Sequence, residues 1–598
     1  MREKIKKIKE YKFFSVILLA LIIFVQIFNI CDIFVGEKHL YHCDEIYSYG
    51  LANGFYQPFI ESDSVYSHDY QYIDEWFSGE VYRNYLTVQE GEQFRYDSVW
   101  YNQSQDRHPP LFYAVLHTIC SFFPDTFSFW LGLIPNLIYF AITQIFLYKL
   151  SRNILKSKYL SLLFCLLWGF TPAAVNNTLF IRMYCMLTMW TVILMYLHSK
   201  LYVTKEKNFL KQLIPIIIVT ALGSLTQYLF LFVAFVTAVC FCVRYLFKKQ
   251  FKVFFAYGLS MLAGVLISFA VFPASVRHLF LEGSNAAGTA FVKQIIISLR
   301  YVFSDIFCLQ QSTLVWLSIF LPPITGILII LSLPILFLFR KNLKLRFFPE
   351  KIRNHFISGI SSLRKGGIRK IYSRIIKINP IMTIMLLSTA AVMLIASYTV
   401  SYILGFANRY LYIIYPFAAL FIFALLCFIF SRLKHQKAVI TFLTVLMIFN
   451  IALNREIVLY WQYDNDINLN HTLDKSNVII VLNGYEEFSI LSTFAYEFYN
   501  ADHIFMTNYD DTAADMDKIG SLESDKPLYI MLYTAGHSQD EKGQSFYYVA
   551  FDGEKCYFKT EYVDDYLSNY RKLNSVDQYE YIGEYEFVEG DYLVYRLN

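Results

Sequence analysis

Long apolar runs separated by short polar connectors occupy most of the chain. Each run spans roughly 16 to 27 residues, enough to cross a hydrocarbon layer about 30 Å thick. They begin near residues 13, 129, 159, 183, 213, 229, 253, 312, 381, 410 and 438, which predicts about eleven transmembrane helices. The segment Leu111 to Phe123 is too short to cross and is expected to lie flat at the outer interface.

Composition supports the same class of protein. The chain has 598 residues, of which 56% are hydrophobic and 19% aromatic, and this excludes an ordinary soluble protein of that length. The basic start MREKIKKIKEYK precedes an apolar run of about twenty residues. No small-residue cleavage site follows that run, so we expect a retained first helix.

Charge orients the helices. Four connectors rich in Lys and Arg, and a longer basic one from Arg340 to Pro380, all fall on one side of the predicted bundle, which the positive-inside rule makes cytoplasmic together with the amino terminus. An odd number of crossings then places residues 456–598 outside. That segment holds 27 acidic against nine basic residues, which fits an extracytoplasmic location.

The predicted fold is therefore mainly α: a polytopic helix bundle over residues 1–455, followed by an extracytoplasmic acidic α/β domain over 456–598. In the second part the pattern predicts strands at Val478 to Leu482 and Leu528 to Tyr533, and helices at Glu487 to Tyr499 and Val563 to Leu573. The ten cysteines are scattered, most of them in apolar runs. We therefore predict neither a disulfide framework nor a zinc site.

Polar residues of unusual type gather at the predicted outer helix ends. Asp44 and Glu45 follow the first apolar run directly, and charge beside a bilayer is costly unless it is paired or solvated. The others map to the same face, and they are Arg107, His108, Arg182, Tyr184, Gln227, Tyr228, Arg409 and Tyr410. Because topology was assigned from Lys and Arg connectors alone, this convergence independently indicates one outward-facing site.

Four short motifs occur in the order Tyr41 to Ser48, Asp106 to Tyr113, Ile181 to Tyr184 and Arg409 to Leu411. Together with the helix layout over residues 10–455, they resemble GT-C glycosyltransferases, in particular the bacterial, family-39-type branch of protein O-mannosyltransferases and lipid A aminoarabinose transferases. The segment Arg182-Met183-Tyr184 is similar to a signature of the second outer loop in that branch.

The resemblance implies an inverting glycosyltransferase that takes a sugar from a polyprenyl phosphate and passes it to a glycan, lipid or protein acceptor at the outer face of the cell membrane. Asp44 would be the general base, with Glu45 as its partner or as a group that orients the acceptor. Donor and phosphate contacts would come from Arg107, His108, Arg182, Tyr184, Arg409 and Tyr410.

Two departures from the family pattern change its implications. Phe180 stands where relatives often carry an acid, so a family metal site that uses this acid is in doubt. No cofactor is predicted, and a divalent cation is unsupported. Gln227 replaces a histidine of relatives; with Tyr228 it is expected to line the substrate or to be structural, because Gln cannot titrate.

The sequence also allows other interpretations of these residues. The Asp44-Glu45 pair could simply cap the following helix. His108, followed by two prolines, fits a phosphate contact or a rigid turn equally, and each arginine could anchor to lipid headgroups. The competing function is a transporter, flippase or binding protein for lipid-linked sugars, although no internal repeat supports it. No nucleic-acid motif is present.

Overall fold

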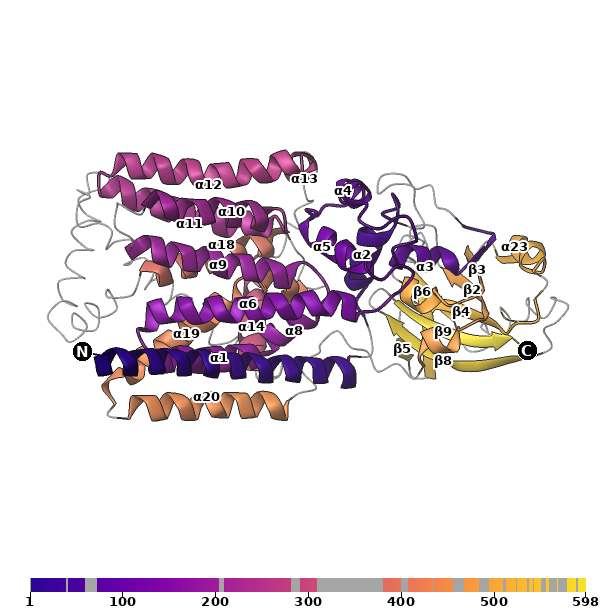
Figure 1. Cartoon of the computed structure of the whole chain (residues 1–598). Helices are drawn as coiled ribbons and strands as arrows, with labels where there is room; N and C mark the ends of the chain where they lie inside the picture. Colours follow the sequence, from indigo (N-terminus) through magenta and orange to yellow (C-terminus); the bar gives the residue numbers. More distant parts are fainter. Residues whose placement is uncertain are drawn as a thin grey trace, which may run out of the picture.

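The computed structural model describes residues 2–38, 41–59, 72–203, 209–280, 291–308, 380–399, 407–433, 435–454, 467–482, 494–508, 512–522, 524–534, 537–540, 543–549, 555–558, 567, 578–587 and 590–597. A bundle of long helices carries the amino terminus at its far end, and a smaller domain built around a sheet carries the carboxyl terminus at the other (Figure 1). The predicted class, a mainly helical membrane bundle with a C-terminal α/β part, is confirmed.

The described helices of the bundle and of the segment that follows α1 are α1 (Arg2–Gly36), α2 (Cys43–Asn53), α3 (Glu80–Leu86), α4 (Tyr96–Gln105), α5 (Leu111–Cys120), α6 (Trp130–Leu155), α7 (Lys158–Phe170), α8 (Pro172–Leu179), α9 (Tyr184–Val203), α10 (Phe209–Ser224), α11 (Leu229–Phe247), α12 (Phe251–Val271), α13 (Ala274–Phe280), α14 (Phe291–Phe307), α18 (Pro380–Thr399), α19 (Tyr415–Ile429) and α20 (Gln436–Leu453). Two short 3-10 helices, η2 (Ala407–Leu411) and η3 (Phe430–Arg432), flank α19.

Six of the described helices are long and apolar enough to cross a membrane, or seven if the bent pair α7 and α8 counts as one span. The chain is thus a multi-pass membrane protein. Apart from the run near residue 312, each predicted run coincides with a described helix. That run and most of the basic connector from Arg340 lie outside the described residues.

The bend between α7 and α8, 56° at Thr171, was not predicted. Thr171 has an extended backbone and its hydroxyl accepts from the Ala174 N–H, while Pro172 occupies the first helical position. This is the start signal of a new helix, because proline lacks an N–H and disfavours helical geometry in the residue before it. The consequence is that α8 carries the following segment, residues 180–183, toward α2.

Amide side chains hold the bundle together where no water is available. Gln26 of α1 donates to the Cys165 and Leu166 carbonyls of α7, each at 3.0 Å, and accepts from Gln144 of α6 at 2.7 Å. Buried polar side chains in a membrane bundle link helices when they find such partners. These bonds therefore fasten α1 onto α6 and α7.

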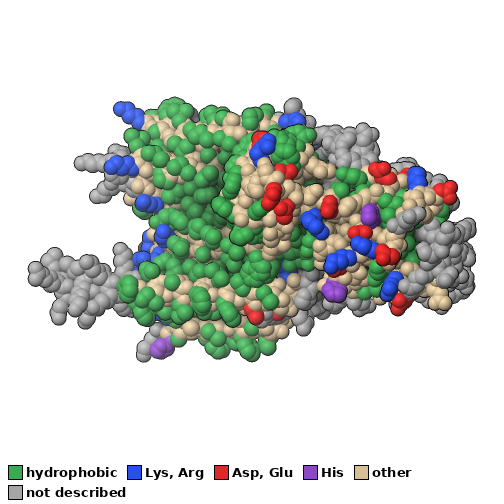
Figure 2. Space-filling model, turned by 45° about the vertical axis from the view of Figure 1, so that its right-hand side comes forward, with side chains coloured by type: hydrophobic (Ala, Val, Ile, Leu, Met, Phe, Trp, Pro, Cys, Tyr) green, Lys and Arg blue, Asp and Glu red, His purple; other side chains and the backbone are tan. Residues whose placement is uncertain are grey.

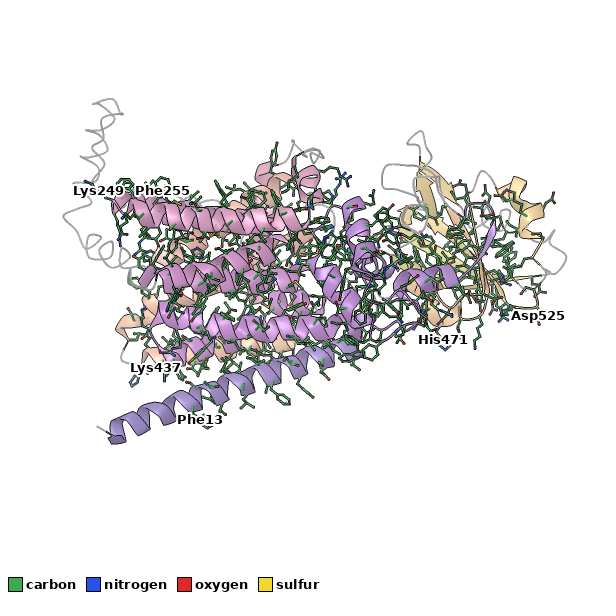
Figure 3. The ribbon with its side chains drawn as sticks, turned by 45° about the horizontal axis from the view of Figure 1, so that its top comes forward. Phe13, Lys249, Phe255, Lys437, His471 and Asp525 are labelled. Carbon is green, nitrogen blue, oxygen red and sulfur yellow. The ribbon has the colours of Figure 1, made fainter. Side chains whose placement is uncertain are left out.

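The two ends of the bundle differ in charge, as the sequence predicts. Lys249 and Lys437 lie at the end away from the C-terminal domain, whereas His471 and Asp525 lie at the opposite end of the molecule (Figure 3). Apolar side chains cover the bundle between them, and Asp and Glu gather toward the C-terminal domain (Figure 2). Which compartment each end faces stays a prediction.

The C-terminal domain contains a six-stranded sheet in the order β1-β3-β2-β4-β9-β8. Its central strands β2 (Asn477–Leu482) and β4 (Leu528–Thr534) match the two predicted ones, while β3 (His503–Asn508), β8 (Tyr579–Phe587) and β9 (Gly590–Leu597) were not predicted. Strand β2 is parallel to β3 and β4, and β9 is antiparallel to both β4 and β8.

Short helices and a second sheet complete this domain: α21 (Leu469–Thr472), α22 (Ala495–Phe498), α23 (Thr512–Ile519) and the three strands β5 (His537–Asp540), β6 (Gly543–Val549) and β7 (Lys555–Phe558). Helix α22 falls inside the predicted helix Glu487 to Tyr499. All of the predicted helix Val563 to Leu573 except Leu567 lies outside the described residues.

One strand of the large sheet comes from the segment between α2 and α3. Strand β1 (Trp76–Ser78) pairs antiparallel with β3, and the Trp76 indole donates to the Ile519 carbonyl at 3.2 Å. Arg83 of α3 donates to the Tyr499 carbonyl beside α22. The sheet thus incorporates a strand from the first predicted outer loop, and this joins the C-terminal domain to the end of the bundle.

Candidate active site

The first turn of α2 lies at the end of the bundle that faces the C-terminal domain (Figure 1). His42 is its N-cap: the imidazole Nδ1 accepts from the Asp44 N–H at 3.1 Å, and Glu45 Oε2 accepts from the His42 N–H at 3.0 Å. This reciprocal capping box fixes the backbone of the turn. As a result, Asp44 and Glu45 are held rigidly and point in different directions.

The Asp44 carboxylate lies between two guanidinium groups from distant parts of the chain. Arg409, on η2, places Nε 3.0 Å from Asp44 Oδ2, and Arg182, between α8 and α9, places an NH2 nitrogen 3.7 Å from Oδ1. Arg182 also donates to the Asp44 carbonyl at 3.2 Å and to the Ser48 hydroxyl at 3.4 Å. The structure therefore brings together three residues that the sequence placed on one face.

Electrostatics keep Asp44 charged. Burial raises the pKa of this carboxyl, but the charges of Arg409 and Arg182 together outweigh burial and hold its pKa below the ordinary value. The neighbouring imidazole of His42 is neutral, because burial lowers its pKa to about 4. The side chain of Asp44 is 18% exposed, so the carboxylate is reachable from outside.

The local fold explains why Arg182 reaches Asp44. Asn136 of α6 donates to the carbonyls of Thr178 and Phe180, both at 3.0 Å, and so fastens the segment that follows α8. Gly132 of α6 allows this close approach, because a Cβ at that position would lie 2.3 Å from the Ile181 side chain. Any larger residue would push the Arg182 segment away.

Asp106 and His108 form a second pair beside the first. His108 Nδ1 lies 2.6 Å from Asp106 Oδ2, and both side chains are partly exposed. Burial raises the pKa of Asp106, but His108 and Arg182 lower it to about 2. Asp106 was not predicted as a site residue, although it belongs to the motif that drew attention to His108; its short bond to His108 was the missing information.

Aromatic rings line the edge of the cluster. The Arg409 guanidinium lies 5.0 Å from the Tyr410 ring, whose centroid is 6.0 Å from that of Tyr184. Tyr113 of α5 lies 5.7 Å from the Arg182 guanidinium. Tyr184 and Tyr410, both predicted as site residues, thus stand next to the two arginines.

The remaining predicted residues lie elsewhere. Glu45 is fully buried on the inner side of the turn. Arg107 is exposed and forms no ion pair with any residue that the structure describes. Gln227 caps α11 by accepting from the Leu229 N–H at 3.1 Å, and the Tyr228 hydroxyl lies 3.0 Å from His278 Nδ1. The Gln227 bond lies at the start of α11, and the Tyr228 bond links that start to α13. Contact of Gln227 or Tyr228 with substrate stays a prediction.

His42, Cys43 and Asp44 place atoms that could bind a metal within 4.8 Å of one another. These residues do not fit a divalent cation. The Nδ1 of His42 already accepts the capping bond from Asp44, and two guanidinium groups flank the carboxylate. A cation placed there would meet positive charge, so no step is assigned to a metal.

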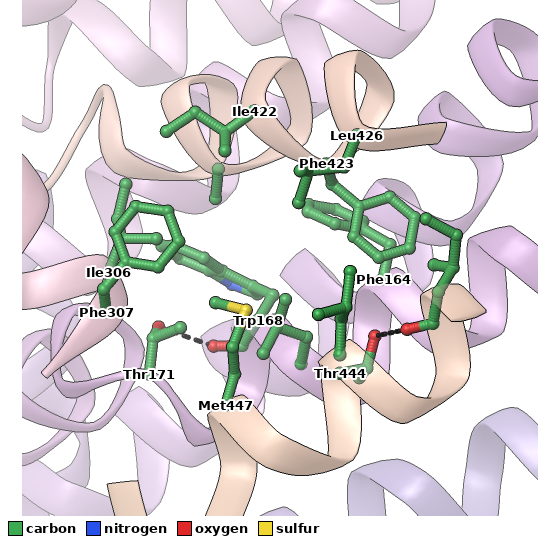
Figure 4. A pocket seen from close by; sticks show the side chains of 14 residues that line it. Phe164, Trp168, Thr171, Ile306, Phe307, Ile422, Phe423, Leu426, Thr444 and Met447 are labelled. Carbon is green, nitrogen blue, oxygen red and sulfur yellow. Dashed lines mark hydrogen bonds between the residues drawn. The ribbon is translucent and has the colours of Figure 1, made fainter. Parts of the chain in front are cut away.

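A separate pocket lies inside the bundle between α7, α14, α19 and α20. Its walls include Phe164, Trp168 and Phe423, and its polar members are Thr171, which donates to a carbonyl of α7, and Thr444, which donates to a carbonyl of α20 (Figure 4). Its volume of about 20 Å³ holds about one water molecule. With no titratable group in its lining, it is not a candidate for chemistry.

No protein-family model matches the sequence, and no curated protein matches it. Among solved structures, the chain is similar to ArnT from Cupriavidus metallidurans in the apo state, at 9% identity and a TM-score of 0.48 over 99% of this chain and 98% of that one. The same protein bound to undecaprenyl phosphate gives 8% identity and a TM-score of 0.46, with 98% of each chain covered.

A third similar structure is the Archaeoglobus fulgidus oligosaccharyltransferase in complex with Zn and sulfate. It shows 13% identity and a TM-score of 0.43, over 95% of this chain and 79% of that one. All three likenesses are distant, and the function proposed next is drawn from the residues of this chain.

Proposed function

We propose that the protein is an inverting glycosyltransferase that moves a sugar from a polyprenyl-phosphate donor to an acceptor hydroxyl at the outer surface of the membrane. The observation that carries the proposal is the Asp44 carboxylate, ionised and reachable, between Arg182 and Arg409 at one end of a membrane bundle. An acid beside two cations provides both a proton acceptor and a site for an anionic leaving group.

In this reaction the acceptor oxygen attacks the anomeric carbon from the face opposite the phosphate. The bond from that carbon to the phosphate oxygen breaks, polyprenyl phosphate leaves, and the acceptor proton passes to Asp44. General-base catalysis of this kind contributes about 10²- to 10⁴-fold. A single displacement inverts the configuration at the anomeric carbon.

The two arginines would stabilise the departing charge. Each guanidinium has five N–H donors, so it can keep one contact to Asp44 and offer others to a phosphate. The donor phosphate would also draw their charge away from Asp44, which raises the basicity of the carboxylate when the donor is bound. This resolves an apparent conflict, because a carboxylate held below its ordinary pKa is a weak base in the free protein.

His108 is assigned to the donor phosphate. Its Nδ1 is engaged by Asp106 at 2.6 Å, which leaves Nε2 for a second partner. A carboxylate on one ring nitrogen fixes the orientation of the imidazole and so directs the other nitrogen toward a phosphate oxygen. The rings of Tyr184 and Tyr410 would support the sugar by stacking.

Transfer is favoured over transport by the position of the charges. Transporters bind substrate near the middle of the bilayer, whereas Asp44, Arg182 and Arg409 lie at an end of the bundle, where the C-terminal domain begins (Figure 1). A lipid-linked donor is available in the same leaflet as such a site, while nucleotide sugars are made in the cytosol.

The test is a transfer assay with purified protein in nanodiscs and radiolabelled donors. We expect transfer from polyprenyl-phosphate sugars and none from UDP- or GDP-sugars in the absence of lipid-linked donor. NMR of the product should show inverted configuration. Transfer from a nucleotide sugar alone, or movement of the labelled lipid between leaflets without transfer, would overturn the proposal.

A further inference from the structure

Two oppositely charged side chains lie fully buried on the inner side of the first turn of α2. The ammonium of Lys38, two residues after α1 ends, is 2.5 Å from Glu45 Oε1, and both side chains have no exposed surface. Lys38 also donates to the Leu179 carbonyl at 2.9 Å. Burying two charges is costly, and only such close contacts compensate for it.

Glu45 makes two further bonds. Its Oε1 accepts from the Ile181 N–H at 2.9 Å, and its Oε2 accepts from the His42 N–H at 3.0 Å. The pair therefore joins three segments that are distant in sequence: the end of α1, the first turn of α2, and the stretch from Leu179 to Ile181. The bond between Glu45 and Ile181 joins the neighbours of two site groups, because Glu45 follows Asp44 and Ile181 precedes Arg182.

We propose that Lys38 and Glu45 are positioning residues that fix the Asp44 carboxylate and the Arg182 guanidinium relative to each other. The inference rests on the proposed function and revises the role expected for Glu45. Neither side chain can reach a substrate, since both are sealed beneath the turn. Their effect on transfer is indirect, through the backbone of the two segments that they tie.

A purely stabilising role is the alternative. Charge is not needed for that, because apolar side chains of similar volume often stabilise a protein as well as a buried ion pair does. Elsewhere in the bundle neutral amides tie segments together, as Gln26 and Asn136 do. What the ion pair adds is a set of directed bonds to three backbone groups, at Leu179, Ile181 and His42.

The double variant K38M/E45L separates the two roles. It removes the directed bonds and leaves no unpaired charge, so the full-length protein should still fold. If the pair positions the site, the kcat of correctly folded protein with a polyprenyl-phosphate sugar should fall on the order of 10²-fold, because small misplacements of reacting groups have effects of this size. The KM for the acceptor should change much less.

The variant Q26L is the matched control, because it also removes buried polar bonds of α1 but acts inside the bundle, about 15 Å before the end of that helix. We expect it to lower the melting temperature while its kcat stays within about twofold of wild type. If K38M/E45L also keeps its kcat within twofold, the positioning role is overturned. If K38M/E45L does not fold, K38M/E45Q takes its place, because it stays neutral and retains an acceptor for the Ile181 N–H. Its kcat should be below that of wild type, but by less than the loss on the order of 10²-fold expected for K38M/E45L.

Hydrogen exchange gives a readout that does not depend on transfer. In wild-type protein the amide of Ile181 is bonded to Glu45, so the peptide over residues 179–184 should exchange slowly. K38M/E45L should speed exchange in this peptide, and Q26L should not. Unchanged exchange there overturns the inference. Inactivity of the wild-type protein with every lipid-linked donor instead counts against the proposed function, and exchange alone then decides the role of the pair.

Discussion

The first turn of α2, at the end of the bundle, and the short helix α22, in the C-terminal domain, both carry carboxylates that are largely or fully buried. In α2 each carboxylate has a cation: Asp44 lies beside Arg182 and Arg409, and Glu45 beside Lys38. In α22, Glu497 is 5% exposed and accepts from the Tyr585 hydroxyl at 3.0 Å. Its other oxygen has no hydrogen-bond partner among the described residues.

The difference shows how burial and pairing decide what a carboxylate can do. Burial raises the pKa of Glu497 to about 7, with no cation among the described residues to oppose it, and the hydrogen bonds from its own backbone N–H and from Tyr585 reverse only part of that shift. At Asp44 the arginines outweigh burial. Asp44 therefore stays charged and available for chemistry, whereas Glu497 gains or loses its proton near neutral pH and affects stability.

The largest effect is expected at Asp44. Asp44→Asn keeps the shape of the side chain but removes its ability to accept a proton, so kcat should fall about 10²- to 10⁴-fold. The amide no longer offsets the charges of the two arginines, so the melting temperature should also fall, and turnover is compared per folded protein. Radiolabelled transfer and thermal unfolding of the same preparation check both parts. A well-folded Asn variant with wild-type turnover would remove Asp44 from the role of base.

The difference between Glu497 and Asp44 predicts that Glu497 makes the stability of the C-terminal domain depend on pH. The folded-state pKa of Glu497 lies above its ordinary value, near 4.5. The C-terminal domain should therefore be most stable below pH 4.5 with respect to this group, and should lose stability as the pH rises through about 7. The full loss is roughly 3 kcal/mol.

Glu497→Gln mimics the protonated side chain and should abolish this dependence. Melting temperatures of the full-length protein at pH 5 and pH 8.5 provide the check. Asp502→Asn is a suitable control, since Asp502 is partly exposed and paired with Lys526 at 2.8 Å. An equal pH response in wild type and Glu497→Gln would show that Glu497 is not the responsible group.

Replacing either arginine should reduce transfer, but by less than Asp44→Asn does. A charge-assisted hydrogen bond contributes about 1.5–3 kcal/mol, so Arg182→Ala or Arg409→Ala should lower kcat/KM by about 10- to 10²-fold. Arg→Lys keeps the charge but loses the planar fork, and a smaller loss is expected. If both Lys variants are fully active and the Ala variants fail only through loss of protein, these arginines anchor the protein in the membrane.

Much of the fold could be predicted from the sequence, because long apolar runs have few alternatives to membrane helices. The strands outside the bundle were harder. In β8, Glu and aromatic residues alternate over Tyr579–Phe587, a strand signal that charge composition masked. Strand β1 has only three residues, and its partner β3 lies more than 400 residues further along the chain. No local pattern predicts such a pairing.

Only part of the candidate site could be predicted from the sequence. Asp44, Arg182 and Arg409 are charged residues at ends of apolar runs, so they stand out in the sequence. Lys38 does not, because a lysine just after a transmembrane helix is ordinary. Its burial depends on contacts with Glu45 and Leu179 that only the folded chain creates.

The smallest predicted effect concerns the pH dependence of transfer. The profile of kcat/KM reports the free protein, and that of kcat reports the protein with donor bound. In the free protein the two arginines hold the pKa of Asp44 below its ordinary value against burial. A bound phosphate partly neutralises them, so the acid limb of kcat should lie about one pH unit above that of kcat/KM.

Arg409→Lys keeps the charge and should preserve this offset, whereas Arg409→Ala should shrink it by raising the pKa of Asp44 in the free protein. Rates must be followed to below the ordinary pKa of an aspartate, from about pH 2.5 to 8, with Asp106→Asn included to identify any contribution from the Asp106–His108 pair. Coincident limbs in the wild-type protein would mean that the donor phosphate does not share the arginines with Asp44.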